Sequence, residues 1–444
     1  MDVIKLTEEL VGINSINPFN VQKYGISNEP TTWILDGNET NIAENLEGKL
    51  KEAGFNLDRQ YVHSNEKGVK FYNLIAEKGE GKKSILFYGH MDTVTAKPWL
   101  SEFDALTPKR MMREILGEQR ETIVGLGSSD MKAGDAAIIA ALRDLNPKGY
   151  KIKVAFGVDE EYYSLGANFL ADPNKSDFLY DVKAIIVPEI GDGPNTCYGP
   201  STITLGRLGR CEHVLKVPGT GGHGAQSKNP DFVNAAVENS KIVTELEPWR
   251  KIYKDEYTFF EGSVPDENAK RSIEGSFFVN QINSGGGSLS IPSEGKVVID
   301  STFTPNITLE KRLSEVRGFI DNMYRFGKLK EFSISGKPQR VTVEPRERPT
   351  PSNNAYITPQ NHNFTKHVRN IVDEMVGFKN YNIGYSVADE NVFARVRKRT
   401  PILGVGPIGD NYHKADEWVE IESVRKLEKV LKEIGKRFGE YASK

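Results

Sequence analysis

Histidine and carboxylate side chains follow the ends of several apolar segments in this sequence, and together they could bind a metal. The segments 84–89, 151–158, 182–188 and 400–406 have the length and apolar content of buried strands. The polar residues that follow them are His90, Glu160, Glu161, Glu189 and His413, and Asp130 stands at the start of a helical segment. Because the carboxyl ends of parallel strands meet at one edge of a sheet, we expect these side chains to lie close together.

The chemistry of this group favours a site for metal ions. Several carboxylates at one sheet edge repel one another unless a cation offsets their charge. Imidazole nitrogen and carboxylate oxygen are ordinary zinc ligands. A pair of ions needs one bridging carboxylate and about two further ligands for each ion. One aspartate as the bridge, with a histidine and a glutamate for each ion, meets that requirement, although the sequence does not exclude a single ion.

Carboxylates beside the ligands have expected roles of their own. Asp92 lies two residues after His90, so both side chains point the same way at a strand end, and Asp92 is expected to accept the second ring N–H of His90. Glu160 and Glu161 are neighbours and cannot point identically. We therefore assign one of them to the metal and the other to proton transfer from water to a leaving amine.

Each of these features alone has a simpler explanation. A His-x-Asp pair is usually a surface feature or a core hydrogen bond, and Glu160-Glu161 is typical of a solvated helix start. Asp130 alone predicts a helix N-cap. A shared site is indicated because these residues all follow the ends of predicted strands or begin a helix, in one chain.

The elements that would position these residues alternate between strand and helix in the first half of the chain. Helical spacing over 40–54, 131–144 and 164–171 alternates with the apolar segments, which predicts an α/β domain with a mostly parallel sheet. The alternation resumes after about residue 360 and ends with a charged amphipathic helix over 421–441.

The middle of the chain has a different pattern. Period-2 segments and two helical segments follow in the approximate order β-α-β-β-α-β, which is typical of a ferredoxin-like α+β fold. We therefore predict a catalytic domain formed by residues 1–202 and 349–444 and interrupted by an inserted domain over residues 203–348.

Composition excludes several classes of protein. The 444 residues include 58 Lys and Arg against 61 Asp and Glu, a net charge of −3, so we expect neither nucleic acid nor a membrane surface as a partner. Residues 1–13 lack the apolar core of a signal peptide, and no apolar run has the ~20 residues of a membrane span. Cys197 and Cys211 could form one bridge at most and are expected to be buried thiols. The predicted location is the cytoplasm.

Six segments of the chain match a family pattern when they are considered together. They are GHMDTV (89–94), GLGSSDMKAG (125–134), VDEEYYSLGA (158–167), IVPE (186–189), GGHGAQSKNPDFVNAA (221–236) and YHKADEWVEI (412–421). In these segments the chain resembles the dinuclear zinc amidohydrolases that include acetylornithine deacetylase, succinyl-diaminopimelate desuccinylase, aminoacylase and glutamate carboxypeptidase. The resemblance implies two Zn²⁺ ions per subunit, with Co²⁺ or Mn²⁺ as possible substitutes, and an inserted lid domain that forms a homodimer.

The resemblance also implies roles for individual residues. The implied metal ligands are His90 and Glu189 for one ion, Glu161 and His413 for the other, and Asp130 as the bridge. Glu160 would be the general base and acid, and Asp92 would orient His90. His223 would reach the active site of a partner subunit, bind substrate and stabilise the oxyanion of the tetrahedral intermediate.

The segments that would contact the substrate depart from the family pattern. Ser290 precedes Ile-Pro where many members have Asn, and Asp300-Ser301-Thr302 lacks the arginine that many members carry there. The segment 108–120 is basic and insertion-like. These differences affect the substrate side of the prediction and leave the metal ligands unchanged.

Two arginines are candidates for the missing carboxylate contact. A substrate carboxylate favours a fork-shaped donor, which Arg346 or Arg348 could supply, although either could equally be a solvated surface residue. Within the family, Glu at the position of Glu189 goes with deacylases and carboxypeptidases. The predicted substrate is therefore a small molecule, either an N-acyl amino acid or a short peptide with a free terminal carboxylate.

The sequence thus predicts a zinc-dependent amidohydrolase of the deacylase or carboxypeptidase type. Two alternatives remain open. The first is a dipeptidase or aminopeptidase with the same metal site. The second is a catalytically silent binding protein that shares the fold.

Overall fold

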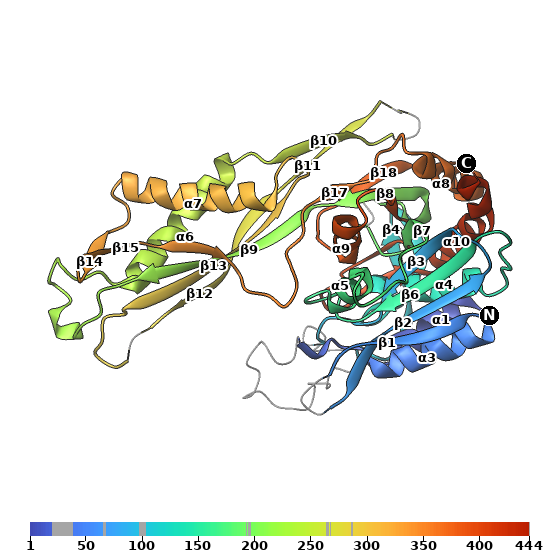
Figure 1. The fold of residues 1–444 in the computed structure, drawn as a ribbon, viewed down its shortest axis with the longest axis horizontal. Coiled ribbons are helices and arrows are strands. Elements are labelled where there is room, and N and C mark those ends of the chain that lie inside the picture. Colours follow the sequence, from blue (N-terminus) through green and yellow to red (C-terminus); the bar gives the residue numbers. More distant parts are fainter. Residues whose placement is uncertain are drawn as a thin grey trace.

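A mixed nine-stranded sheet forms the larger part of the computed structural model (Figure 1). The structure describes residues 1–19, 39–64, 68–96, 104–191, 193, 197–262, 266, 268–285 and 287–443. The strands run in the order β1-β2-β6-β3-β7-β19-β8-β17, and β18 also pairs with β8. Their bounds are β1 (Asn56–Ser64), β2 (Lys70–Gly79), β3 (Ser84–His90), β6 (Lys151–Gly157), β7 (Val182–Val187), β8 (Thr202–Arg207), β17 (Tyr356–Ile357), β18 (Asn380–Gly384) and β19 (Ile402–Gly404).

The centre of this large sheet is parallel, as the sequence predicts. Strands β6, β3, β7 and β19 pair in parallel, so their carboxyl ends lie at one edge. The four strands begin within two residues of the predicted apolar segments, because those segments are rich in residues that pack on both faces of a sheet. The outer pairs β1–β2 and β2–β6 are antiparallel.

Helices cover both faces of the large sheet. One apolar cluster joins it to α1 (Val3–Val11), α3 (Thr40–Glu52), α4 (Ala133–Leu142), α8 (Asn363–Val376) and α10 (Ile421–Ala442). A second cluster joins the other face to α5 (Leu165–Ala171) and α9 (Asp389–Val396). Alternate side chains of β3 divide between the clusters, with Phe87 in the first and Tyr88 in the second. The result is a three-layer α/β/α arrangement.

A second, smaller sheet extends away from the first (Figure 1). It is antiparallel throughout, in the order β12-β13-β9-β16, and α6 (Ala235–Ile252) and α7 (Leu309–Arg325) share its apolar cluster. Its strands are β9 (Gly209–Pro218), β12 (Ser276–Ser284), β13 (Glu294–Phe303) and β16 (Thr342–Pro345). The chain order β9-α6-β12-β13-α7-β16 follows the predicted β-α-β-β-α-β order. Its last strand is β16, whereas the sequence pattern places that strand over residues 331–337, which lie outside this sheet.

Short hairpins add to this pattern. β10 (Glu256–Phe260) pairs with β11 (Lys270–Glu274) between α6 and β12, and β14 (Phe332–Ile334) pairs with β15 (Lys337–Gln339). The basic segment 108–120 belongs to β4 (Lys109–Ile115) and β5 (Glu118–Val124), which form a four-stranded sheet with β20 (Gly409–Asp410) and β21 (Trp418–Glu420). The sequence pattern indicates a strand over 331–337, which contains β14, but not its pairing with β15. The other strands of these hairpins are too short or too irregular in pattern to be predicted from the sequence.

The connection between the two parts differs from the predicted boundary in detail. The division at residues 202 and 203 stays a prediction, but β8 lies wholly in the large sheet, so the chain reaches the small sheet only after Arg207. The β10–β11 hairpin also returns to the large sheet, where Arg271 donates a hydrogen bond to Asn382 of β18. No helix among the described residues has the length and apolar character needed to cross a bilayer.

Candidate metal centre

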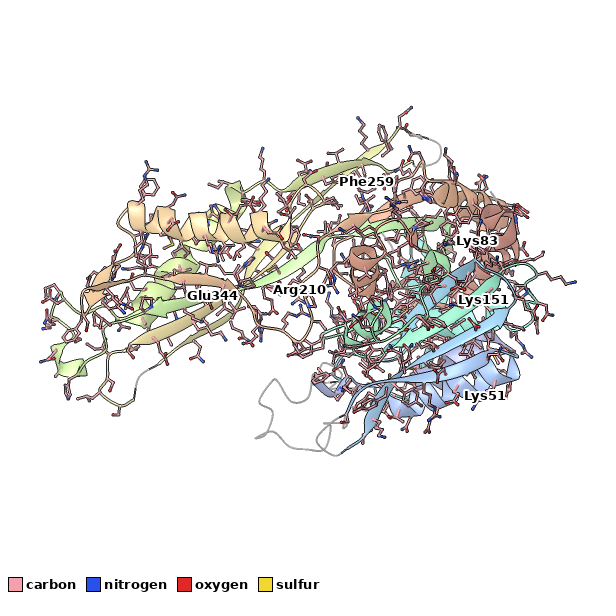
Figure 2. All side chains as sticks on the ribbon, in the orientation of Figure 1. Lys51, Lys83, Lys151, Arg210, Phe259 and Glu344 are labelled. Atoms are coloured by element: carbon pink, nitrogen blue, oxygen red, sulfur yellow. The ribbon has the colours of Figure 1, made fainter. Side chains whose placement is uncertain are left out.

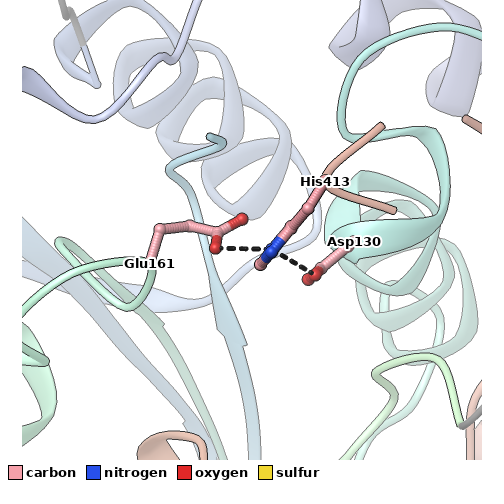
Figure 3. A group of neighbouring side chains, drawn as sticks. All are labelled: Asp130, Glu161 and His413. Carbon is pink, nitrogen blue, oxygen red and sulfur yellow. Dashed lines mark ion pairs between the residues drawn. The ribbon is translucent and has the colours of Figure 1, made fainter. Parts of the chain in front are cut away.

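Three of the predicted ligands meet at the carboxyl edge of the large sheet (Figure 3). His413 Nε2 lies 2.9 Å from Glu161 Oε2 and 3.5 Å from Asp130 Oδ2. Glu161 follows β6, Asp130 precedes α4, and His413 lies in the loop between β20 and β21. One ligand atom from each of the three residues lies within 4.8 Å of the other two, which is a spacing that a single cation can span.

His90 approaches the same aspartate from the other side. Its Nε2 lies 3.0 Å from Asp130 Oδ1, whereas His413 contacts Oδ2. His90 ends β3 and is buried, so its ring has little freedom to turn away. The two oxygens of Asp130 therefore each face a different imidazole, which suits a carboxylate shared by two cations.

Asp130 does not cap a helix, contrary to the simpler explanation of its position. The N-cap residue of α4 is Lys132, and Ser128–Lys132 forms a separate turn in which Asp130 has non-helical backbone angles. The predicted helix over 131–144 accordingly begins only at Ala133. This irregular turn directs the carboxylate of Asp130 towards the histidines instead of along the helix axis.

Asp92 makes different contacts from those predicted. His90 Nδ1 lies 3.1 Å from the backbone oxygen of Asp92 and 3.6 Å from its carboxylate. The Asp92 carboxylate instead accepts hydrogen bonds from the backbone N–H groups of Glu160 and Glu161, each at 3.0 Å, and from the amide of Asn17 at 2.8 Å. Asp92 therefore fixes the segment that carries both glutamates, while its backbone orients His90.

Glu417 holds the turn that carries Asp130. It lies in the segment 412–421 that matches the family pattern, but the sequence does not assign it this role. Its buried carboxylate accepts hydrogen bonds from the backbone N–H groups of Gly127, Ser129 and Asp130 at 2.8 to 3.0 Å and from the Ser129 hydroxyl at 3.0 Å. Burial raises the pKa of Glu417 to about 7, and the charge of Asp130 acts in the same direction. The backbone donors oppose this rise by stabilising the ionised form.

Replacing Glu417 by alanine is expected to lower the free energy of unfolding by about 3 kcal/mol or more, because several buried donors lose their acceptor at once. Chemical denaturation monitored by circular dichroism measures this change. Glu422→Ala, in the first turn of α10, is the matched control, because Glu422 is half exposed and should contribute under ~0.5 kcal/mol. Equal stabilities of the two variants would contradict the role of Glu417.

Glu189 lies in the same cavity but pairs with an arginine that no sequence pattern indicates. Arg207 Nη2 lies 2.8 Å from Glu189 Oε1, and Arg207 Nε lies 2.8 Å from Glu390 Oε1. Burial raises the pKa of Glu189 to about 8, although Arg207 opposes that rise. Because Arg207 contacts Oε1, Glu189 can still offer Oε2 to a cation.

A cavity of about 410 Å³ opens over these residues. Glu160 lines it, and its side chain is partly buried beside Glu161 and Glu189. Burial raises the pKa of Glu160 well above its usual range, as do the nearby carboxylates of Asp389, Glu189 and Glu161, whereas His90 lowers it. A carboxyl group with a raised pKa, next to metal ligands, is suited to exchange protons near neutral pH.

The two predicted arginines have different surroundings. Arg348 lines the cavity, donates a hydrogen bond to the backbone oxygen of Tyr162 at 3.0 Å, and has a buried Nε without a hydrogen-bond partner among the described residues. Arg346 forms an ion pair with Glu212 and is not among the cavity residues. Arg207 and Arg210 also line the cavity.

Arg210 and Asp300 explain one departure from the family pattern. Arg210 Nη2 lies 2.6 Å from Asp300 Oδ2, and its Nε lies 3.1 Å from both carboxylate oxygens. Figure 2 labels Arg210 at the start of β9, where the small sheet joins the large one. The segment Asp300-Ser301-Thr302 lacks the arginine that many family members carry there. Arg210 of the neighbouring strand β9 places an arginine beside this segment.

His223 lies away from the cavity of its own chain. It follows β9, which starts near the cavity and runs outward over ten residues, a length of about 30 Å. His223 pairs with Ser290 beyond the outer ends of β9 and β13, is exposed, and accepts a hydrogen bond on Nδ1 from the Ala225 N–H at 3.2 Å. The fold of one chain therefore does not bring His223 to the metal centre.

The donor set fits divalent metal ions. Two imidazoles and three or four carboxylates converge there, and the carboxylate of Glu161 raises the pKa of His413 to about 12. A metal ion would take over that stabilisation by binding the neutral ring and the carboxylates together. Nitrogen and oxygen donors of this kind are ordinary ligands of zinc and other first-row metals.

Comparison with known proteins agrees with this chemistry. Residues 86–437 match the profile of peptidase family M20/M25/M40. The chain is 25% identical over 410 residues to an acetylornithine deacetylase of Photorhabdus laumondii, covering 91% of this chain and 92% of that protein. Its fold is similar to that of the aminopeptidase PepT from Bacillus cereus, with a TM-score of 0.66, 16% identity and 98% of each chain covered. It is also similar to an M20 family metallo-carboxypeptidase from Sulfolobus solfataricus, with a TM-score of 0.64, 15% identity, and 98% of this chain and 99% of that chain covered. The chain therefore belongs to peptidase family M20/M25/M40 and is a metal-dependent hydrolase of amide bonds.

Proposed function

We propose that the enzyme holds two zinc ions and cleaves N-acyl amino acids or the C-terminal peptide bond of short peptides. His90 and Glu189 would hold one ion, Glu161 and His413 the other, and Asp130 would bridge them. The observation that carries this proposal is that each oxygen of Asp130 faces a different histidine, at 3.0 Å and 3.5 Å. When bound, the ions would activate water and polarise the amide carbonyl.

Glu160 is the proposed acid and base of the reaction. It lines the cavity next to the ligands, and burial raises its pKa, so it can accept a proton from the attacking water and later give it to the leaving amine. Asp92 supports this role, because it accepts the backbone N–H groups of Glu160 and Glu161 and so fixes their positions.

Arg348 is the proposed anchor for the substrate carboxylate. It lines the cavity and presents a buried Nε that has no protein acceptor among the described residues, which leaves a donor for a ligand oxygen. Arg346, the second candidate from the sequence, is already engaged by Glu212. The proposed site therefore contains Arg348 and not Arg346.

Replacing Arg348 by methionine is expected to raise KM about 10- to 100-fold for a substrate with a free carboxylate and to change kcat little, since a charge-assisted hydrogen bond contributes ~1.5–3 kcal/mol. Steady-state kinetics with an N-acetyl amino acid and its uncharged amide separate this effect from a general loss of activity. Arg346→Met is the matched control and should leave KM within about threefold. An equal rise for the charged and uncharged substrates would refute the carboxylate contact.

A panel of substrates tests the proposed specificity. N-acetyl and N-succinyl amino acids, peptides with blocked amino termini and unblocked dipeptides should be compared by kcat/KM on the zinc-loaded enzyme. The proposal expects blocked substrates with a free carboxylate to be preferred. A preference for unblocked peptides would instead identify a dipeptidase or aminopeptidase with the same metal centre.

The same proposal includes a homodimer in the cytoplasm. The exposed position of His223, about 30 Å along β9 from the cavity, supports a role in the active site of a partner subunit, where it would bind the substrate and stabilise the oxyanion. Cys197 and Cys211 are both buried free thiols, which supports a reducing compartment. Analytical ultracentrifugation and mixing of a His223→Ala chain with an inactive Glu160→Gln chain test the shared site, because such mixtures should regain activity.

A further inference from the structure

A basic pocket lies at the opposite edge of the large sheet from the metal centre. It has a volume of about 850 Å³. The residues that line it lie at the starts of β3 and β7, in the connection between α9 and β19, at the N-terminus of α8 and at the C-terminus of α10. Its cationic lining residues are Lys83, Lys183, Arg397, Lys398 and Arg399, and no aspartate or glutamate among the residues that the structure describes lines it. The whole chain has 58 basic and 61 acidic residues, so this pocket is a strong local excess of positive charge.

The carboxylates of the described residues do not neutralise these five cations. Within the described part of the chain none of them forms an ion pair with a carboxylate. Asp181, which precedes the lining residues Val182 and Lys183 in the sequence, is engaged by Lys151 and Lys153, at 2.8 Å and 2.5 Å. Like charges held together without counter-charges repel one another, and a bound anion would remove that repulsion.

Part of the pocket is already fixed in place. Arg397 donates a hydrogen bond to the backbone oxygen of Val182 at 3.1 Å, and Lys83 donates one to the backbone oxygen of Ala442. Figure 2 labels Lys83 near the C-terminal helix α10. Lys183, Lys398 and Arg399 are exposed, so they can turn towards a ligand. The pocket thus combines anchored and adjustable donors.

The N-terminus of α8 contributes further donors to the same pocket. Asn361, His362 and Asn363 line it, and His362 Nδ1 accepts the N–H of Phe364, so a neutral His362 carries its proton on Nε2. The partial positive charge of a helix N-terminus adds to that of the five side chains. Together these groups can donate hydrogen bonds to an anion from several directions.

We propose that this basic pocket binds a small molecule that carries two or more phosphate groups. A phosphate chain presents several charged oxygens in different directions and matches five cations better than one carboxylate can. A pocket of 850 Å³ is large enough for a small-molecule ligand of this type. Tyr441 also lines the pocket, but its ring already packs against Phe364 and Phe438. Because this ring is engaged by the protein, the phosphate groups account for the recognition of the ligand.

Isothermal titration calorimetry of the full-length, metal-loaded enzyme at low ionic strength tests this proposal. Inorganic tripolyphosphate, adenosine triphosphate and citrate are the three probes. We expect saturable binding of tripolyphosphate, weakened by added salt and tighter than that of citrate. Tighter binding of adenosine triphosphate than of tripolyphosphate would identify a nucleotide as the ligand, and equal or weaker binding would identify the phosphate chain alone.

Charge reversal locates the bound phosphate. The double variant Lys183→Glu/Arg399→Glu is expected to weaken tripolyphosphate binding about tenfold or more, because two attractive contacts become repulsive. Lys426→Glu/Lys429→Glu changes the net charge equally at exposed positions of α10 outside the pocket and should leave binding within about twofold. Unchanged amide hydrolysis in both variants shows that they are folded. Equal binding by both variants, no saturable phosphate binding, or citrate binding as tight as tripolyphosphate would overturn the proposal.

Discussion

Glu160→Gln is expected to keep the bound metal and to lose about 10³-fold or more of the turnover rate. Glutamine has the shape of glutamate but cannot accept a proton from water or return it to the leaving amine, and proton transfer of this kind contributes about 10²- to 10⁴-fold to a rate. The backbone N–H of Glu160 still bonds to Asp92 in this variant, so the chain should retain its local structure.

Two measurements together decide this prediction. Metal content by inductively coupled plasma mass spectrometry should equal that of the unchanged enzyme, while kcat for an N-acetyl amino acid falls. Glu118→Gln, at a well-exposed position of β5, is the control and should have normal kcat. Normal turnover by Glu160→Gln would remove Glu160 from the mechanism, and loss of metal would make it a ligand.

The second large effect is expected from Asp130→Asn. Loss of a group that only supports a metal ligand costs about 10- to 100-fold in affinity, so loss of a shared ligand should weaken metal binding more than about 100-fold at both positions. Activity should fall with it. The backbone N–H of residue 130 remains bonded to Glu417, so the turn should keep its shape.

Competition with a chelating dye measures the metal affinity of this variant. Both ions should dissociate more readily from Asp130→Asn than from the unchanged enzyme. Asp144→Asn, an exposed position after α4, is the control and should bind metal normally. Loss of only one ion, with the other held as tightly as before, would mean that Asp130 does not bridge.

The sequence predicts the large sheet well because its central strands are nearly continuous apolar runs. β3, β6 and β7 are buried along most of their length, so the apolar pattern and the strand coincide, and the polar residue after each run must lie at the sheet edge. The β10–β11 hairpin could not be predicted in the same way. Its two strands have only five residues each, too few to form a clear alternating pattern, and the hairpin contacts β18, more than 100 residues later in the chain.

Supporting residues were missed for a related reason. Glu417 stands in the matching segment 412–421, but its role is visible only because the fold places it against a turn nearly 290 residues earlier. Arg207 gains its role because it ends β8 of the large sheet beside Glu189, and Arg210 because it lies in β9 of the small sheet beside Asp300 of β13. The pattern of neighbouring residues in the sequence carries no information on contacts between residues that are far apart in the chain.

Arg346 and Arg348 illustrate the same limit within one segment. They lie two residues apart after β16, and the sequence offers no basis for choosing between them. In the structure their contacts differ. Arg346 forms an ion pair with Glu212 of β9, whereas Arg348 donates a hydrogen bond to the backbone oxygen of Tyr162 at the cavity.

The most direct test of a two-zinc amidohydrolase is a metal titration of the chelated enzyme. The protein should be stripped of metal, then titrated with zinc while activity on an N-acyl amino acid and bound metal per chain are followed in the same samples. We predict no activity without metal, recovery with zinc or cobalt, and two ions bound per chain at full activity. Full activity in the metal-free protein would contradict the central claim.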